Sequence, residues 1–134
     1  MKLLLDTHAF LWACRDQKNL PGAIQAAILC TDNQVLVSAA SIWEITMKAA
    51  SGKQLFWTPN EPIDILETYV GRLGATRLPI SNRHALATFG FREWSNKDPF
   101  DRLLAAQALE EKAQLVTADQ AFGACPVKLD LLWA

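Results

Sequence analysis

Hydrophobic residues along the chain follow two patterns, short continuous runs and longer stretches with a helical period. The short runs, which are typical of buried strands, are Lys2–Leu5, Val35–Ser38, Thr76–Ile80, Leu115–Thr117 and Val127–Leu132. The helical stretches are Thr7–Cys14, Pro21–Cys30, Ser41–Ala50, Pro62–Leu73, Ser81–Phe89 and Pro99–Lys112. Lys53–Pro62 and Gly90–Lys97 predict loops. Strands that alternate with helices in this way predict an α/β fold, with a mainly parallel central sheet and helices on both faces.

The size and composition of the chain favour one globular domain that spans residues 1–134. Its 134 residues fit a single hydrophobic core, and 51% apolar with 20% charged residues is a globular balance. No apolar run approaches the roughly 20 residues that a membrane-spanning helix needs. The first apolar run is also too short for the core of a signal peptide. We therefore expect a soluble, cytoplasmic protein without a membrane partner.

Charge and cysteine content narrow the function only slightly. The net charge is −1, from 13 basic and 14 acidic residues, which counts against a protein that coats nucleic acid without sequence preference. It does not exclude an enzyme that acts on RNA, because a bound metal ion offsets local acidic charge. Cys14, Cys30 and Cys125 are odd in number and irregularly spaced, so we expect reduced and mostly buried thiols.

Four acidic residues are expected at one edge of the predicted sheet. Asp6 and Asp119 follow two of the strands, whereas Glu44 and Asp101 lie near the starts of two helices. In parallel α/β sheets, ligands bind beyond the carboxyl ends of the strands. Carboxylate oxygens are the preferred ligands of hard cations such as Mg²⁺ and Mn²⁺, which can activate water and stabilise a phosphate under attack. The pattern therefore indicates a carboxylate metal site.

Each of these acids also fits an ordinary structural role. Asp6, Asp98 and Asp119 stand where helix-capping residues stand, and Ser41 and Glu44 have the spacing of a capping box. Capping explains an acid near each helix start, but it does not require the acids to lie next to one another. Asp98 and Asp101 are three residues apart on one helix, and Asp101, one turn inside it, is the better ligand candidate.

Several polar residues beside the acids are candidates for orienting them or for contacting substrate. Thr7, Ser38 and Thr117 could fix the carboxylates by hydrogen bonds, although Ser and Thr are also common at caps and strand ends. Arg102 could reach a phosphate or pair with Asp98, or it could be an ordinary exposed arginine of a helix. His8 and His84 show no metal-ligand spacing.

At these residues the chain resembles a known family. LLLDTHAFLW, VSAASIWEI, DPFDRLLAAQA and LVTAD occur here in the order and approximate spacing of the PIN-domain VapC toxins. The resemblance covers essentially the whole chain, and the last two motifs are its most specific part. The acids that bind metal and carry catalysis in that family match Asp6, Glu44, Asp101 and Asp119. Asp98 belongs to the DPFDR variant of the motif, and the resemblance assigns it no role.

The resemblance implies more than the residues do. It implies a PIN-like α/β/α sandwich, dependence on Mg²⁺ or Mn²⁺, and cleavage of RNA by an endonuclease. It also implies a homodimer and inhibition by a cognate VapB-type antitoxin, which carries the promoter-DNA binding of the pair. Phe56 and Trp57, in a predicted loop, are our choice for an antitoxin or dimer contact. Trp94 is a second loop aromatic, whereas Trp12 and Trp43 are expected in the core.

Two other functions could also use acids at strand ends or the same fold. A phosphatase or phospho-acceptor domain also clusters acids at strand ends, but Asp6 is followed by Thr7 and His8 and not by the DxD pattern of a phosphatase. A receiver domain would place a lysine after a late strand, where this chain has Asp119. A catalytically silent PIN-fold protein-binding module is the main alternative, and loss of one of the four acids would have favoured it.

Overall fold

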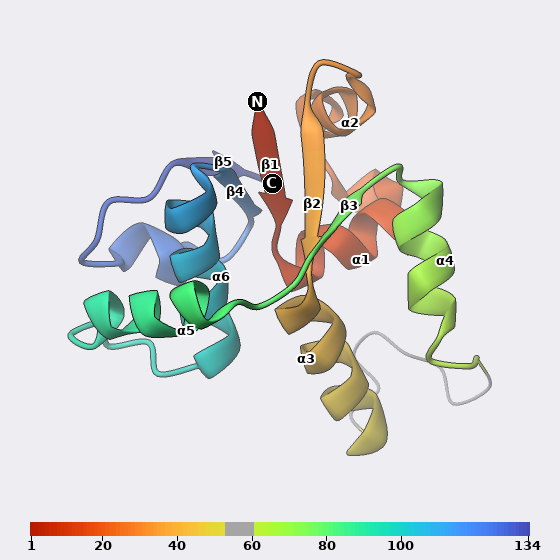
Figure 1. Cartoon of the computed structure of the whole chain (residues 1–134). Coiled ribbons are helices and arrows are strands. Elements are labelled where there is room, and N and C mark those ends of the chain that lie inside the picture. The colour runs from red at the N-terminus through yellow and green to blue at the C-terminus, as the bar shows by residue number, and fades with distance from the viewer. Residues whose placement is uncertain (53–60) are drawn as a thin grey trace.

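The computed structural model describes residues 1–52 and 61–134, and its centre is a parallel sheet of five strands with the order β3-β2-β1-β4-β5 (Figure 1). All four strand pairings are parallel, which confirms the predicted α/β class. The strands are β1 (Lys2–Leu5), β2 (Gln34–Ser38), β3 (Thr76–Leu78), β4 (Gln114–Thr117) and β5 (Leu131–Trp133).

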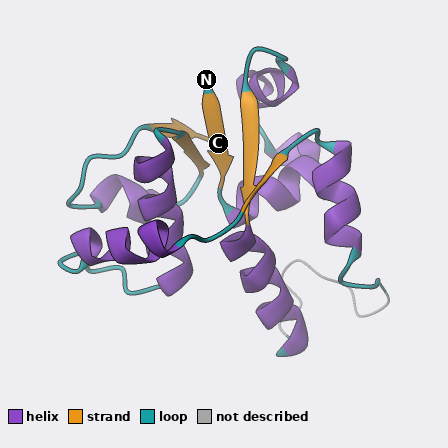
Figure 2. Cartoon of the chain, in the orientation of Figure 1, coloured by secondary structure: helices purple, strands orange, loops and turns teal. Residues whose placement is uncertain are grey.

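Helices connect the strands and cover both faces of the sheet (Figure 2). The α-helices are α1 (Thr7–Arg15), α2 (Gly22–Leu29), α3 (Ala39–Ala50), α4 (Ile65–Arg72), α5 (Asn82–Ala87) and α6 (Pro99–Glu111). Three short 3₁₀ helices are η1 (Gln17–Asn19), η2 (Thr88–Phe91) and η3 (Gln120–Ala124). Within residues 1–52 and 61–134, none of the helices has the length and apolar character needed to cross a membrane.

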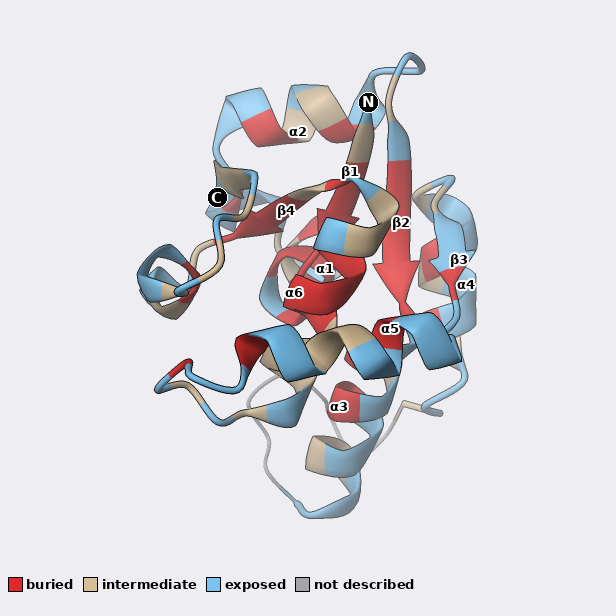
Figure 3. Ribbon diagram, turned by 60° about the vertical axis from the view of Figure 1, so that its left-hand side comes forward, coloured by how far each residue is buried: buried red, intermediate tan, exposed pale blue. Residues whose placement is uncertain are grey.

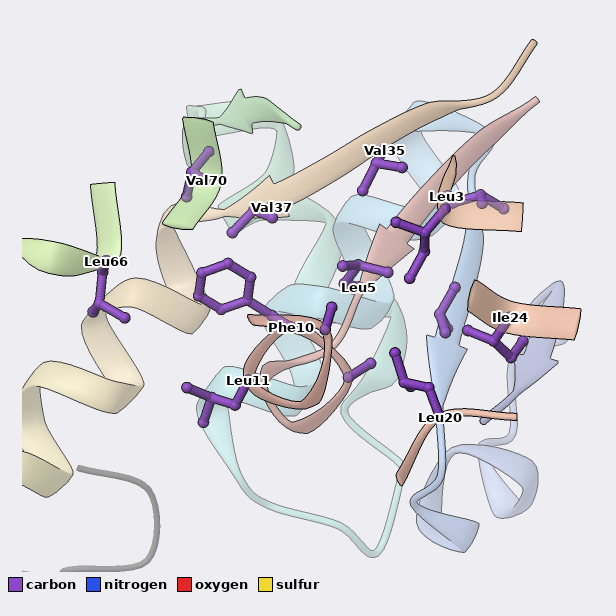
Figure 4. Close-up of a cluster of buried hydrophobic side chains, with 14 of the residues drawn as sticks. Leu3, Leu5, Phe10, Leu11, Leu20, Ile24, Val35, Val37, Leu66 and Val70 are labelled. Carbon is purple, nitrogen blue, oxygen red and sulfur yellow. The ribbon is translucent and has the colours of Figure 1, made fainter. Parts of the chain in front are cut away.

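Two hydrophobic cores lie on opposite faces of the sheet, because successive side chains of a strand point to opposite faces. Leu3 and Leu5 of β1 belong to the core under α1, α2 and α4, which includes Phe10 (Figure 4). Leu4 belongs to the other core, where Leu104 of α6 is buried. The continuous run of leucines is thus explained by a strand that is buried on both faces.

The central strands are the most buried part of the fold (Figure 3), and the sheet order reverses at β1. β1 pairs with β2 on one side and with β4 on the other. The backbone N–H of Asp6 extends the second pairing by donating to the carbonyl of Val116 at 3.0 Å. Open parallel sheets bind ligands beyond the strand ends at such a reversal, so the carboxyl ends of β1 and β4 mark the expected site.

The predicted boundaries differ from the structure at several elements. The helix predicted from Ser41 begins at Ala39, with Ser38 as its N-cap accepting from the N–H of Ala40, so Ser41 and Glu44 do not form a capping box. Ser41 lies inside the helix and is buried against the hydroxyl of Thr7. The C-terminal strand is shorter and later than the predicted Val127–Leu132, and the predicted helix from Ser81 changes to 3₁₀ geometry at Thr88.

The burial of two tryptophans is the reverse of what we predicted. Trp43, expected in the core, is 55% exposed and packs edge-on against Phe100. Trp94, expected as an exposed loop aromatic, is 2% exposed and packs against Phe91 and Phe122 in the core. Phe56 and Trp57 lie outside the described residues.

The cysteines are less buried than we predicted. Cys14 and Cys125 are half-buried and Cys30 is exposed, because it follows the last turn of α2 at the surface. All three are free thiols. Burial raises the pKa of the Cys14 thiol to about 12, so this thiol is protonated at neutral pH.

Candidate active site

The four predicted acids come from the ends of the central strands and from the helices that follow. Asp6 follows β1, Glu44 lies in α3 after β2, Asp101 lies in the first turn of α6, and Asp119 comes two residues after β4. Asp119 raises the pKa of both Asp6 and Asp101, and Glu44 raises that of Asp101 as well. The fold therefore brings the four acids within electrostatic reach of one another at the carboxyl edge of the sheet.

Asp6 is the most constrained of these carboxylates. Its side chain is 4% exposed and caps α1, with Oδ1 accepting from the N–H of Ala9 at 2.8 Å. Oδ2 accepts from the hydroxyl of Thr117. Burial raises the pKa of Asp6, and the hydrogen bonds from Thr117 and Ala9 oppose that rise. Asp6 is thus both a helix cap and a buried acid of the site.

Glu44 is buried and has a partner at each oxygen. The hydroxyl of Thr7 donates to Oε1 at 2.6 Å, and Nζ of Lys48 lies 2.6 Å from Oε2. Lys48 is one turn further along α3, so the ion pair joins residues four apart on the same helix. Thr7 follows Asp6 directly, and its hydroxyl couples the carboxyl end of β1 to α3.

Asp101 and Asp98 have different roles at the start of α6. Asp98 is the N-cap, with Oδ1 accepting from the N–H groups of Phe100 and Asp101. Asp101 Oδ2 accepts from Nδ2 of Asn96 at 2.8 Å. Burial raises the pKa of Asp101 to about 6, and repulsion from the neighbouring acids, Asp98 among them, adds to that rise. Asp101 is therefore partly protonated near neutral pH.

Asp119 is exposed and is tied to Asp6 through Thr117. The N–H of Asp119 donates to the hydroxyl of Thr117 at 3.0 Å, and that hydroxyl donates in turn to Asp6. The carboxylate of Asp119 caps η3 by accepting from the N–H of Ala121 at 2.9 Å. Thr117 thus fixes two of the acids with one hydroxyl group.

Two further candidates do not contact the acids. The hydroxyl of Ser38 caps α3 and donates to Gln107. Arg102 donates to the carbonyl oxygens of Asn96 and Trp94, at 2.9 and 2.7 Å, and so braces the loop before α6. It therefore neither pairs with Asp98 nor points freely into solvent, because the loop folds back over its guanidinium group.

A pocket of about 250 Å³ opens beside two of the acids, Asp6 and Asp119. It is lined by Asp6, His8, Trp12, Ala118 and Asp119. His8 and Trp12 meet edge to face with ring centroids 5.8 Å apart. This pocket lies at the reversal of the strand order, where the fold predicts a ligand.

The donor set at this edge suits a hard divalent cation. The candidate ligands are all carboxylate oxygens, and their mutual repulsion is of the kind that a bound cation relieves. In the described part of the chain, however, no three acidic, histidine or cysteine side chains are close enough together to hold an ion. Binding would therefore require these side chains to shift, and Glu44 would have to loosen its ion pair with Lys48 to take part.

Sequence reasoning missed Asn96 and Lys48 as partners of the acids. Lys48 could have been found from its spacing of four residues from Glu44 on a predicted helix. Asn96 could not, because its contact with Asp101 depends on how the loop before α6 folds.

Comparison with known proteins agrees with the geometry. A family model described as the PIN domain matches residues 3–127. The chain therefore belongs to the PIN domain family, as the sequence motifs predicted. A search of curated protein sequences finds no significant match.

Solved structures share the fold at low sequence identity. VapBC2 from Rickettsia felis, bound to a DNA fragment from its promoter, aligns with a TM-score of 0.74 and 17% identity, covering 100% of this chain and 99% of that one. DNA-bound VapBC from Salmonella typhimurium gives 0.70 and 20%, covering 99% and 98%. VapBC-1 from nontypeable Haemophilus influenzae gives 0.63 and 20%, covering 100% and 97%.

Proposed function

We propose that this protein is a divalent-metal-dependent endoribonuclease and the toxin of a type II toxin–antitoxin pair. The observation that carries the proposal is the electrostatic coupling of Asp6, Glu44, Asp101 and Asp119 at the reversal of the strand order. Acids that raise each other's pKa lower the stability of the fold, and carboxylates perturbed in this way cluster at functional sites. Membership of the PIN domain family supports the same conclusion.

Each acid would hold Mg²⁺ or Mn²⁺ through its carboxylate oxygens. A bound ion supplies a water of lowered pKa and positive charge for the phosphate under attack. The chain's own part is to keep the ligands in place. Thr117 holds Asp6, Thr7 holds Glu44, and Asn96 holds Asp101, each through one hydrogen bond to a carboxylate oxygen. Such supporting contacts typically change metal affinity or activity by about 10- to 100-fold when they are removed.

The proposed partner is a VapB-type antitoxin that inhibits the enzyme. The three solved structures compared above are VapBC structures, two of them described as bound to DNA. We propose that this chain likewise pairs with an antitoxin, that promoter DNA is contacted only through that partner, and that the toxin is a cytoplasmic homodimer. The net charge of −1 fits a protein that leaves DNA binding to its partner.

A catalytically silent binding module remains the second candidate. It is favoured by one observation, the ion pair between Lys48 and Glu44, which occupies a carboxylate that a nuclease would need. A module that keeps the PIN fold for protein contacts alone would have no need to release that carboxylate.

Expression in a bacterial host, with total RNA sequenced for new 5′ ends, separates the two candidates. We expect discrete new ends with the wild type and none with Asp6→Asn, because the amide keeps the size of the side chain and loses its charge. Asp64→Asn is the matched control, since Asp64 is an exposed acid whose side chain caps nothing.

The same three proteins are then purified and incubated with the RNA substrate under two conditions, one with Mn²⁺ and one with EDTA added. Cleavage by the wild type and by Asp64→Asn that stops in EDTA is the expected result. Equal cleavage by wild type and Asp6→Asn would refute the metal-site nuclease. Absence of cleavage by all three would favour the binding module.

A further inference from the structure

We propose that Lys48 is a displaceable counter-ion of the acidic site. In the ion-free protein it neutralises Glu44, and when Glu44 binds a divalent cation the ammonium group is released to contact a phosphate of the nucleic acid. This inference rests on the proposed function, because it assumes that the acids bind a metal ion. It adds a residue that neither the motifs nor the family assignment singled out.

The ion pair is short and asymmetric in its exposure. Nζ of Lys48 lies 2.6 Å from Oε2 of Glu44, while the side chain of Glu44 is 7% exposed and that of Lys48 is 32% exposed. The other oxygen of Glu44 is already satisfied by Thr7 at 2.6 Å. Lys48 therefore holds the oxygen that remains for a metal ion, and it does so from the solvent side.

Lys48 balances only part of the negative charge. Within residues 1–52 and 61–134 its ion pair is with Glu44 alone, and Glu44 still adds to the rise in the pKa of Asp101 that burial mainly causes. A divalent cation, by contrast, can contact several carboxylates at once. Because one oxygen of Glu44 cannot serve both cations closely, metal binding and the ion pair compete, and removing Lys48 should strengthen metal binding.

The released side chain suits a phosphate contact. A lysine ammonium is a point charge on a flexible stem of four carbons, and here it would stay within one helical turn of Glu44. Arg102, the arginine next to Asp101, is occupied by two backbone carbonyl groups. A polyanionic substrate approaching this acidic edge gains from a cation that becomes available only after the metal ion has bound.

Two constants that move in opposite directions test the proposal. Mn²⁺ binding is measured by calorimetry, and RNA cleavage by steady-state kinetics, for wild type, Lys48→Met and Lys48→Arg. Lys48→Met keeps an unbranched side chain, one atom shorter, and removes its charge. We expect it to bind Mn²⁺ about fivefold more tightly and to show a KM for RNA about fivefold higher. Lys48→Arg keeps the charge and should remain within about twofold of wild type in both constants.

Lys18→Met is the matched control, because Lys18 is 86% exposed and lies 3.9 Å from its partner Asp16. It should change neither constant. If wild type binds no Mn²⁺, the proposed function itself fails. If wild type binds Mn²⁺ but Lys48→Met binds no more tightly, only the counter-ion role of Lys48 fails. A weaker affinity for both Mn²⁺ and RNA in a folded Lys48→Met would show that the lysine supports the ligands, and it would overturn the proposal.

Discussion

The molecule has two buried polar regions, and they treat charge in opposite ways. One is the acidic site, with Asp6 and Glu44 as its buried carboxylates. The other, which we call the Gln107 network, joins Ser38, Gln107, His84 and Glu111 across β2, α6 and α5. Both regions link elements that are far apart in the sequence.

The Gln107 network satisfies its members. Gln107 is fully buried; its Oε1 accepts from Ser38, and its Nε2 donates to the carbonyl of Pro79 at 3.2 Å and lies 3.3 Å from Nδ1 of His84. The N–H of Ser81 also donates to Nδ1, at 3.1 Å, which assigns the ring proton to Nε2. Nε2 then donates to Glu111 at 3.0 Å, and this hydrogen bond is the main reason that the pKa of Glu111 is lowered.

In the acidic site the carboxyl pKa values are raised and not lowered. Burial raises the pKa of Asp6 and Asp101, and the neighbouring acids raise it further. A buried network that is fully hydrogen-bonded stabilises and specifies the fold. A cluster of like charges that repel one another lowers stability, and such repulsion is typical of functional sites. Removing a charge from the acidic site should therefore raise stability, whereas removing hydrogen bonds from the Gln107 network should lower it.

The largest effect on stability is expected for Gln107→Ala. It removes three hydrogen bonds and leaves a cavity and unpaired buried groups, so the free energy of unfolding should fall by about 3 kcal/mol. Denaturant unfolding measures it. Gln34→Ala is the control, since Gln34 is exposed and its side chain donates, among the described residues, only to Thr76 at 3.3 Å; it should change stability by under about 0.5 kcal/mol. Equal effects of the two substitutions would show that the buried hydrogen bonds of Gln107 stabilise the fold no more than those of an exposed glutamine.

A smaller loss is expected for Thr117→Val. The substitution keeps the shape of a fully buried side chain but removes the donor to Asp6 and the acceptor for the N–H of Asp119. The free energy of unfolding should fall by about 1.5 kcal/mol, and the pKa of Asp6 should rise. Unfolding and carboxyl NMR titration report the two changes. Thr117→Ser retains the hydroxyl and should preserve the pKa; if it shifts as far as Thr117→Val does, the hydroxyl is not the cause.

Asp101→Asn should raise stability. The folded-state pKa of Asp101 is about 6, above the ordinary value of 3.8, so the folded chain binds more protons than the unfolded chain between those values and loses stability as pH rises through them. The amide has no charge to ionise and can still accept from Asn96. Its melting temperature should exceed that of wild type by about 3 °C at neutral pH, and the gain should vanish below about pH 4. A variant less stable than wild type at neutral pH would contradict the claim that ionised Asp101 destabilises the fold.

The smallest effect is expected for Lys2→Ala. Lys2 reaches Glu111 at the outer end of the Gln107 network, but the contact is 3.7 Å long and the side chain of Lys2 is 43% exposed. Exposed pairs of this kind contribute under about 1 kcal/mol, and we expect a change of about 0.3 kcal/mol in unfolding experiments. A loss as large as that for Gln107→Ala would show that Lys2, at the surface, belongs to the Gln107 network.

Local pattern predicted most of the fold and the positions of the acids. Lys2–Leu5 and the acid after it were identified because a strand buried on both faces has a continuous apolar run that ends abruptly. The capping role of Asp98 followed from its place before a proline. Both features depend on neighbours in sequence.

What could not be predicted depends on contacts between distant segments. Ser41 has the spacing of a capping box with Glu44 in sequence, but in the fold it lies inside α3, and its hydroxyl oxygen is 3.1 Å from that of Thr7, which is distant in the chain. Trp94 is buried because the loop before α6 folds onto Phe122, whereas Trp43 lies on the outer face of α3. The contact of Thr7 with Glu44 and that of Asn96 with Asp101 likewise depend on how the chain folds, whereas the contact of Lys48 with Glu44 is local to α3.

The most direct test of the account is Mn²⁺ binding to the wild-type protein, measured by calorimetry at about pH 7.5 and about pH 5. If the strained carboxylates form a cation site, Mn²⁺ binds at the higher pH. The affinity then falls about tenfold or more at the lower pH, because Asp101, with a pKa of about 6, and Asp6, with its raised pKa, take up protons in competition with the ion. An absence of binding at the higher pH, or the same affinity at both, would contradict the account.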